Sequence, residues 1–240
     1  LVDGSDVNAF DSADGSLIWS KTLSPDHRYL PVAKGGYLVV SEKRNRLRLL
    51  NSATGEEHWS QFFATPLLNS PIIHKNMIIV SQIHRDTRTP SFKGIDLKNG
   101  HIVWDYKTSN VYGKEVSPPS VMGNVMVVVL SRQGTPEVVA FDTNTGGVVW
   151  ILPWTRYDAN PKLAPIVTNN GVFLVKDSRD PDKPGLMVSH VDGRTGKVTR
   201  SMSLPPLLNK SVIRIAAIQT YKHYLYILLG GSQGKIISIK

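Results

Sequence analysis

Few side chains in this sequence are grouped in a way that could support a chemical reaction. The seven histidines, at positions 27, 58, 74, 84, 101, 190 and 223, are dispersed, and none belongs to a His-x-x-x-His or Glu-x-x-His pair of the kind that binds a metal. Cysteine is absent, which excludes thiolate nucleophiles, disulfides and cysteine-based metal sites. We therefore expect no catalytic, cofactor-binding or metal-binding residue, although the sequence leaves enzymatic activity open.

One polar loop gathers carboxylates that could bind a hard cation. Asp177, Asp180 and Asp182 lie within six residues of one another, and calcium prefers clustered oxygen ligands. The same stretch contains Pro181 and Lys183, which are typical of a solvated loop. We favour the solvated loop over a cation site.

The chain is basic, with 28 Lys and Arg against 19 Asp and Glu and a formal net charge of +9. A basic balance attracts nucleic acid, anionic lipid or an acidic protein. RNA-binding modules interleave aromatic and basic residues on one sheet, and that pattern is absent, so we expect no sequence-specific nucleic acid. The densest basic cluster, residues 43–48, reads as a solvated hairpin tip that leads into a strand. We predict an acidic or membrane-associated protein partner, with candidate contacts at Lys43, Arg44, Arg46, Arg48, Arg85 and Arg88.

A turn motif recurs five times in the sequence, and the elements that it forms must position the carboxylate loop and the basic cluster. It occupies residues 9–19, 49–59, 94–104, 140–150 and 190–200. In each copy an Asp or Asn precedes a glycine by four positions, and in the first four copies a tryptophan follows that glycine by four. The motif residues are Asp11, Gly15 and Trp19; Asn51, Gly55 and Trp59; Asp96, Gly100 and Trp104; Asp142, Gly146 and Trp150; and Asp192 and Gly196, with Arg200 in place of the fifth tryptophan. An Asx side chain accepts backbone N–H groups in such a turn, and glycine adopts a positive φ without steric cost.

Strand-like segments surround each copy of the motif. Residues 7–10, 46–50 and 137–141 alternate or are β-branched, and further hairpins are predicted over residues 71–80, 120–129, 165–175 and 213–227. Each unit therefore contains four antiparallel strands in about 45 residues, and tandem units of this size predict a β-propeller. We expect each motif tryptophan to wedge between neighbouring blades, where its large area is buried.

The consensus Ala-x-Asp-x-x-Thr-Gly-x-x-x-Trp, matched most closely by residues 140–150, resembles the repeat of the pyrroloquinoline-quinone-type, or quinoprotein-like, β-propellers. The resemblance implies blades of a ring that usually has seven or eight. We expect residues 1–240 to form a single, incomplete propeller domain of about five blades' worth of sequence. It would begin at the third strand of a blade, Asp6–Phe10, end on another third strand at Lys240, and close with further blades or other polypeptide.

The resemblance also frames the functional alternatives. Quinone-dependent dehydrogenases of the family use an Asp base, a calcium site and often a vicinal disulfide, and that disulfide cannot form here. The sequence looks more similar to the non-catalytic branch, which includes the outer-membrane β-barrel assembly lipoprotein subunit and the propeller of the endoplasmic-reticulum membrane insertase. We expect an extracytoplasmic scaffold without a cofactor, in the periplasm or the endoplasmic-reticulum lumen. A dehydrogenase fragment and a sensory ligand-binding propeller remain alternatives.

Overall fold

A computed structural model describes residues 2–3, 5–26, 29–84, 86–87, 89–108, 111–132, 135–153, 165–169, 171–178, 185–204, 214–221, 224–230 and 235–239. These residues form β-strands joined by turns, with one 3-10 turn at Lys43–Asn45 and no α-helix. None of them belongs to a helix with the length and hydrophobicity that crossing a membrane requires. The chain divides into two compact units, residues 1–109 with 144–146 and residues 110–143 with 147–240.

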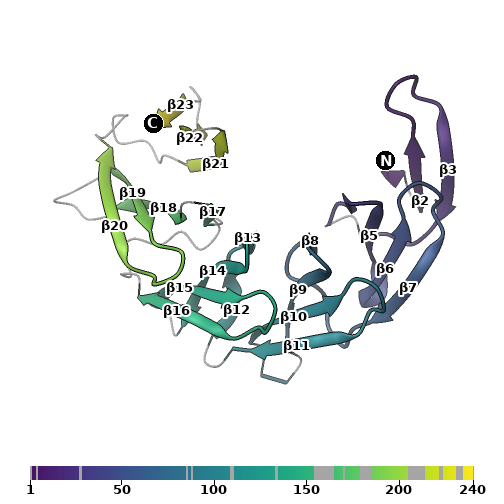
Figure 1. The fold of residues 1–240 in the computed structure, drawn as a ribbon, viewed down its shortest axis with the longest axis horizontal. Helices are drawn as coiled ribbons and strands as arrows, with labels where there is room; N and C mark the ends of the chain where they lie inside the picture. The colour runs from purple at the N-terminus through teal and green to yellow at the C-terminus, as the bar shows by residue number, and fades with distance from the viewer. Residues whose placement is uncertain are drawn as a thin grey trace. The chain divides into compact units, whose positions relative to one another are not determined.

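The first unit contains three antiparallel sheets whose strands follow one another in chain order (Figure 1). The first sheet holds β1 (Val2–Asp3), β2 (Asp6–Phe10) and β3 (Leu17–Thr22). The second sheet holds β4 (Val32–Lys34), β5 (Tyr37–Glu42), β6 (Arg46–Asn51) and β7 (Glu57–Phe62). The third sheet holds β8 (Ile72–His74), β9 (Met77–Ile83), β10 (Pro90–Asp96) and β11 (Ile102–Lys107).

The second unit repeats the same plan. One sheet holds β12 (Val111–Val116), β13 (Ser120–Met122), β14 (Val125–Arg132), β15 (Thr135–Asp142) and β16 (Val148–Pro153). The next holds β17 (Ile166–Thr168), β18 (Gly171–Ser178), β19 (Gly185–Val191) and β20 (Val198–Leu204). The last sheet holds β21 (Arg214–Tyr221), β22 (Tyr224–Gly230) and β23 (Lys235–Ile239).

The predicted hairpins are confirmed, and two details differ from the prediction. The first sheet does not begin at Asp6, because Val2 pairs with Val7 and Asp3 with Asp6 in the ladder between β1 and β2. The strand before β14 is split into β12 and β13, which pair with opposite ends of β14. Prolines 118 and 119 separate the two pieces, and proline cannot donate to a ladder.

The turn motif forms the predicted Asx-turns. The side-chain Oδ1 of Asp11, Asn51 and Asp96 accepts the backbone N–H two residues further on, at 2.7, 2.8 and 2.9 Å. The glycine four positions after the Asx residue has a φ between +70° and +76° in all five copies. A side chain is strained at such a φ, so the turn itself accounts for the recurring glycine.

Trp19, Trp59, Trp104 and Trp150 each pack on the glycine of the next copy of the motif. A Cβ placed on Gly55, Gly100, Gly146 or Gly196 would lie 2.6–2.8 Å from the ring of Trp19, Trp59, Trp104 or Trp150, respectively. Three of these indoles also donate a hydrogen bond to the carbonyl three residues before that glycine. The pairs are Trp19 Nε1 to Ser52 O (3.0 Å), Trp59 Nε1 to Leu97 O (2.9 Å) and Trp150 Nε1 to Gly193 O (2.9 Å). We call this contact the indole–glycine seam.

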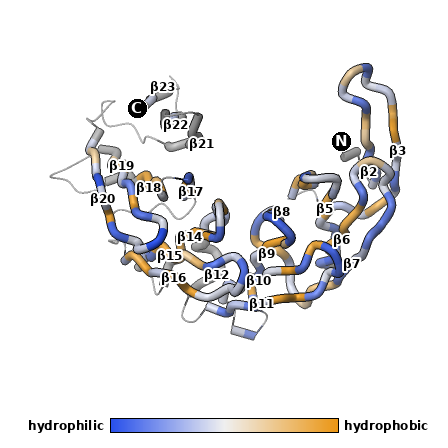
Figure 2. Tube along the Cα trace, in the orientation of Figure 1, coloured by the Kyte–Doolittle hydropathy of each residue, from blue (hydrophilic) through white to orange (hydrophobic). Residues whose placement is uncertain are grey.

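Apolar side chains fill the space between sheets that follow one another in the chain. In the first unit Leu47 and Leu49 of β6 share a buried cluster with Ile78 and Val80 of β9 and Ile95 of β10. Figure 2 shows the hydrophobic residues concentrated along β9. In the second unit Val127, Val138 and Leu174 belong to an equivalent cluster. Burial of both faces of a sheet in this way is what a stack of sheets provides and a lone sheet cannot.

We predict that Gly100→Ala lowers the free energy of unfolding by about 2–4 kcal/mol. The positive φ and the overlap of a Cβ with the Trp59 ring each cost about 1–2 kcal/mol. Gly36→Ala is the matched control, because Gly36 has a φ of +83° and open space around its Cβ position. Urea unfolding measures both. Equal losses for the two variants would show that the seam contact contributes nothing beyond backbone strain.

Candidate protein-docking surfaces

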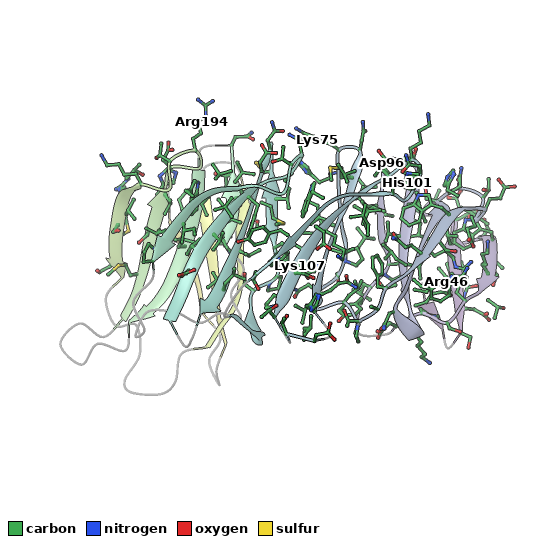
Figure 3. The ribbon with its side chains drawn as sticks, turned by 90° about the horizontal axis from the view of Figure 1, so that it is seen from below. Arg46, Lys75, Asp96, His101, Lys107 and Arg194 are labelled. Atoms are coloured by element: carbon green, nitrogen blue, oxygen red, sulfur yellow. The ribbon has the colours of Figure 1, made fainter. Side chains whose placement is uncertain are left out.

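The motif turns and the first residues of the basic cluster lie at opposite ends of the strands. The motif turns lie at one end, where Figure 3 shows Lys75, Asp96 and His101 in the first unit. Arg46 begins β6 and Lys107 ends β11, so both lie at the opposite end, and Figure 3 draws them below those three residues. Of the predicted basic contacts, Lys43 and Arg46 therefore belong to the end away from the motif turns.

The basic cluster forms a corner between β5 and β6 whose two strand arginines are paired within the chain. Arg48 donates to Glu42 Oε2 from Nε (3.1 Å), has Nη2 3.0 Å from the same oxygen, and pairs with Glu57. Arg46 lies 3.6 Å from Glu42 Oε2 and 3.8 Å from Glu57 Oε1. Two cations thus face two anions, so the two arginines attract an acidic partner less strongly than four basic residues among positions 43–48 suggest.

Glu42 is buried and holds the corner to the segment that enters the sheet. Its Oε1 accepts the Ser24 backbone N–H at 3.1 Å, and the Lys43 N–H donates to Ser24 O at 2.7 Å. Arg46 also donates from Nη2 to Ser60 Oγ (2.7 Å) and lies over the exposed Phe62 ring at 5.1 Å. A buried carboxylate needs such partners, since an unpaired charge is strongly destabilising.

The structure describes only some of the remaining predicted contacts. Lys43 is exposed on the 3-10 turn, whereas the side chain of Arg44 and all of Arg85 and Arg88 lie outside the described residues. The docking role of the six basic residues stays a prediction. Sequence reasoning missed the carboxylates at 42 and 57 as their partners, because Glu42 and Glu57 become neighbours of Arg48 through strand pairing.

The outer edges of the sheets carry exposed apolar side chains. In chain order these edges are β3, β7, β11, β16 and β20. Leu17, Ile18, Phe62, Ile102, Val103, Val148, Val149, Ile151 and Val198 are all exposed on them. On the opposite side, four short strands, β4, β8, β13 and β17, are preceded directly by Pro31, Pro71, Pro119 and Pro165, and proline at an edge discourages pairing.

One of these outer edges, β16, lacks a charge. It reads Val-Val-Trp-Ile-Leu-Pro, and Figure 2 draws it largely in the hydrophobic colour. The other outer strands contain Lys21, Glu57, Asp105 or Arg200. Val149 and Ile151 are exposed while Trp150 between them is buried in the seam. Since charge is a common protection of an edge against strand pairing, β16 is the least protected outer edge in the described part of the chain.

The described residues contain no group of three His, Asp or Glu side chains that could hold a metal ion. Residues 230–234 spell Gly-x-Ser-x-Gly, the letters of a nucleophile elbow. Residues 231–234 lie outside the described residues; the strands on either side, β22 and β23, pair antiparallel, whereas an elbow joins a strand to a helix. Of the predicted carboxylate loop, Asp180 and Asp182 lie outside the described residues.

Comparison with known proteins identifies the family. The family model described as outer membrane protein assembly factor BamB matches residues 3–128 and 110–240. The chain belongs to this family. A search of curated proteins finds no match.

The solved structures that are similar to this fold include BamB and quinoprotein enzymes. BamB from Moraxella catarrhalis is 17% identical with a TM-score of 0.56, and the alignment covers 97% of this chain and 79% of that one. Quinohemoprotein alcohol dehydrogenase ADHIIG from Pseudomonas putida HK5 is 15% identical with a TM-score of 0.62, covering 94% of this chain and 48% of that one. The corresponding enzyme from Comamonas testosteroni is 16% identical with a TM-score of 0.54, covering 85% and 41%. The predicted all-β fold of four-stranded propeller blades is confirmed, whereas the single domain of residues 1–240 stays a prediction.

Ionisation of the corner makes stability depend on pH. Partial burial raises the pKa of Glu57, but the Ser60 hydroxyl and the Arg48 and Arg46 guanidinium groups outweigh burial and bring the pKa below its ordinary value. A lowered pKa in the folded state means that ionised Glu57 stabilises the fold above the unfolded pKa of about 4.3. That contribution is lost as the pH falls through the folded-state pKa.

We therefore expect the free energy of unfolding to fall more steeply between about pH 5 and about pH 3 in the unmodified chain than in Glu57→Gln. Urea unfolding at several pH values measures the slopes. Glu56→Gln, a change of the same charge one residue away on the exposed turn, is the control and should keep the slope of the unmodified chain. Parallel curves for the unmodified chain and Glu57→Gln would contradict the stabilising role of the corner.

Proposed function

We propose that this member of the BamB family is a non-catalytic scaffold that docks a protein partner during outer-membrane protein assembly. The family match and the extent of the alignment with BamB support the proposal. The observation that carries it is the uncharged outer edge β16, which offers a strand with exposed Val148, Val149 and Ile151. We further propose an extracytoplasmic location, the periplasm, by analogy with the outer-membrane role in the family description.

The edge suggests how a partner binds. Within the described residues, the outer side of β16 has no neighbouring strand. An extended segment of the partner can therefore add to β16, with backbone hydrogen bonds providing affinity and alternate side chains providing specificity. Val149 and Ile151 point to the same face of the strand because side chains alternate. A partner strand with apolar residues opposite these two fits the edge better than a charged one.

The basic residues add a second, electrostatic element. Lys43 is exposed at the corner, and the chain carries a net charge of +9. Such a balance speeds the approach of an acidic or membrane-associated partner more than it strengthens the final complex. In this proposal the net positive charge of the chain steers the encounter and the β16 edge holds the partner.

The alternative function is that of a fragment of a quinone-dependent alcohol dehydrogenase. The observation in its favour is the TM-score of 0.62 with a quinohemoprotein alcohol dehydrogenase, of which the chain covers 48%. In that case the residues that bind the quinone would lie largely in sequence beyond this chain. A likeness of fold does not by itself carry an activity.

Substitutions on β16 test the docking edge. We expect Val149→Lys combined with Ile151→Lys to weaken binding to purified barrel-assembly components about tenfold or more, because two charges at the edge disfavour strand addition. Biolayer interferometry measures the affinity. Ile102→Lys with Val103→Lys on β11, an edge that already carries Asp105 and Lys107, is the matched control and should change the affinity by less than about twofold. Unaltered binding by the β16 variant would exclude this edge as the docking site.

A cofactor titration separates the two functions. We expect no saturable quenching of tryptophan fluorescence when the purified chain is titrated with pyrroloquinoline quinone in the presence of calcium. The four motif indoles are occupied by the seam, so a quinone has no free stacking platform among them. Tight, saturable quenching at stoichiometric quinone would overturn the scaffold proposal and favour the dehydrogenase fragment.

A further inference from the structure

The positive charge of the chain is concentrated in one part of its sequence. Residues 193–240 contain eight Lys and Arg and no Asp or Glu. Residues 1–192 contain the other 20 Lys and Arg together with all 19 Asp and Glu, so this part is close to neutral. A one-sided charge of this kind indicates where an anionic partner binds, which the net charge of the whole chain does not.

Three of these eight cations have described side chains, and they lie on the last turn motif and on β20. Arg194 and Lys197 are exposed in the turn between β19 and β20, and Arg200 is exposed on β20 itself. Figure 3 shows Arg194 extending away from the strands at the end that carries this turn. The side chains of the other five cations lie outside the described residues.

These three cations lack the internal partners that the arginines of the corner have. Among the described residues, no carboxylate forms an ion pair with any of the three, whereas the corner arginines share two glutamates. The nearest acidic residue in the sequence, Asp192, uses its Oδ1 to accept the N–H groups of Arg194 and Thr195 and the Thr195 hydroxyl. An exposed cation without an internal partner keeps its attraction for an external anion.

Strand β20 is an outer edge of polar character. It is the last strand of its sheet, and within the described residues no strand pairs with its outer side. Thr199, Ser201 and Ser203 are exposed on it beside Arg200. Like β16, it therefore offers backbone donors and acceptors to an added strand. Unlike β16, it carries a charge, which discourages pairing with an apolar strand or with another basic one.

We propose that β20 and the turn before it dock an extended acidic segment of a partner protein. The segment pairs with the outer side of β20 and places carboxylates beside Lys197 and Arg200. Opposite charges on neighbouring strands stabilise each other, so the segment gains backbone hydrogen bonds and charge pairs together. The same cations exclude a basic segment or a second copy of this edge, because like charges would then be adjacent.

Two other anionic partners fit this surface less well. An anionic membrane is bound most firmly where large apolar side chains enter it beside the cations. Single-stranded nucleic acid is bound by aromatic side chains on which its bases stack. The turn and β20, residues 193–204, contain no Trp, Tyr or Phe. An acidic peptide needs only the cations and the backbone of the edge, and both are present.

Two synthetic peptides of equal charge test the proposal on the unmodified chain. The first is a fluorescein-labelled peptide of about twelve residues that alternates Thr and Glu, so that every Glu points to one face of the added strand. The second replaces every second Thr with Pro, which removes backbone N–H groups and keeps the charge. Fluorescence anisotropy measures both affinities. We expect the Pro-containing peptide to bind about tenfold more weakly or worse.

A pair of substitutions locates the site. We expect Lys197→Gln combined with Arg200→Gln to weaken binding of the Thr-Glu peptide about tenfold. Lys98→Gln combined with Lys107→Gln is the matched control, because it removes the same charge from an exposed motif turn and an exposed outer strand of the first unit. The control should change the affinity by less than about twofold.

Three outcomes would overturn the proposal. Equal affinities for the two acidic peptides would show attraction to charge without strand addition. Equal losses in the two double variants would show that the net charge, and not β20, binds the peptide. Binding to phosphatidylglycerol vesicles or to a single-stranded oligonucleotide, but not to the Thr-Glu peptide, would assign the cations to another class of partner.

The proposal does not depend on the scaffold function, because β20 and β16 are outer edges of different sheets. The Val149→Lys, Ile151→Lys variant of β16 should therefore bind the Thr-Glu peptide at least as tightly as the unmodified chain. Loss of peptide binding in the β20 variant with unchanged affinity for barrel-assembly components, or the reverse result in the β16 variant, would separate the two proposals.

Discussion

The fold depends on the contact between an indole and a glycine that has no Cβ. A four-stranded sheet has two faces to bury, and within each unit apolar side chains of consecutive sheets are buried against one another. The indole reaches the neighbouring turn because that turn presents bare backbone at a φ of +70° to +76°, where a larger residue would be both strained and in the way. The same contact gives the indole N–H a carbonyl acceptor, so a large apolar side chain is buried without leaving a polar group unpaired.

The charged corner shows how the same sheet handles polar groups away from the seam. Glu42 is buried, yet it accepts bonds from Ser24 and Arg48 and is not left uncompensated. The corner joins the segment that enters the second sheet to two of its strands, so it holds the sheet against the connection that precedes it. A cluster that reads as a cationic patch along the chain thus acts in part as an internal brace.

The two edges of the sheets have different chemistry, and this difference has consequences for function. Prolines precede the short strands on one edge, whereas β-branched residues are exposed on the other. A scaffold needs a surface that other proteins can use without disturbing the seams. The outer strand β16 provides such a surface, because Trp150 is buried in the seam while Val149 and Ile151 on either side of it are exposed.

The sequence by itself determined the repeat, the turn chemistry and the role of the tryptophans, because these follow from local spacing: an Asx residue, a glycine four positions later and an indole four beyond that. It also indicated the hairpins, apart from the ladder at Val2 and the split strand around residues 118 and 119. Tertiary structure decided which charges meet. Glu42 and Glu57 are remote from each other in sequence and neutralise Arg48 through strand pairing. Local spacing in the sequence indicates which interactions a residue is able to make. Strand pairing and packing determine which residue it makes them with.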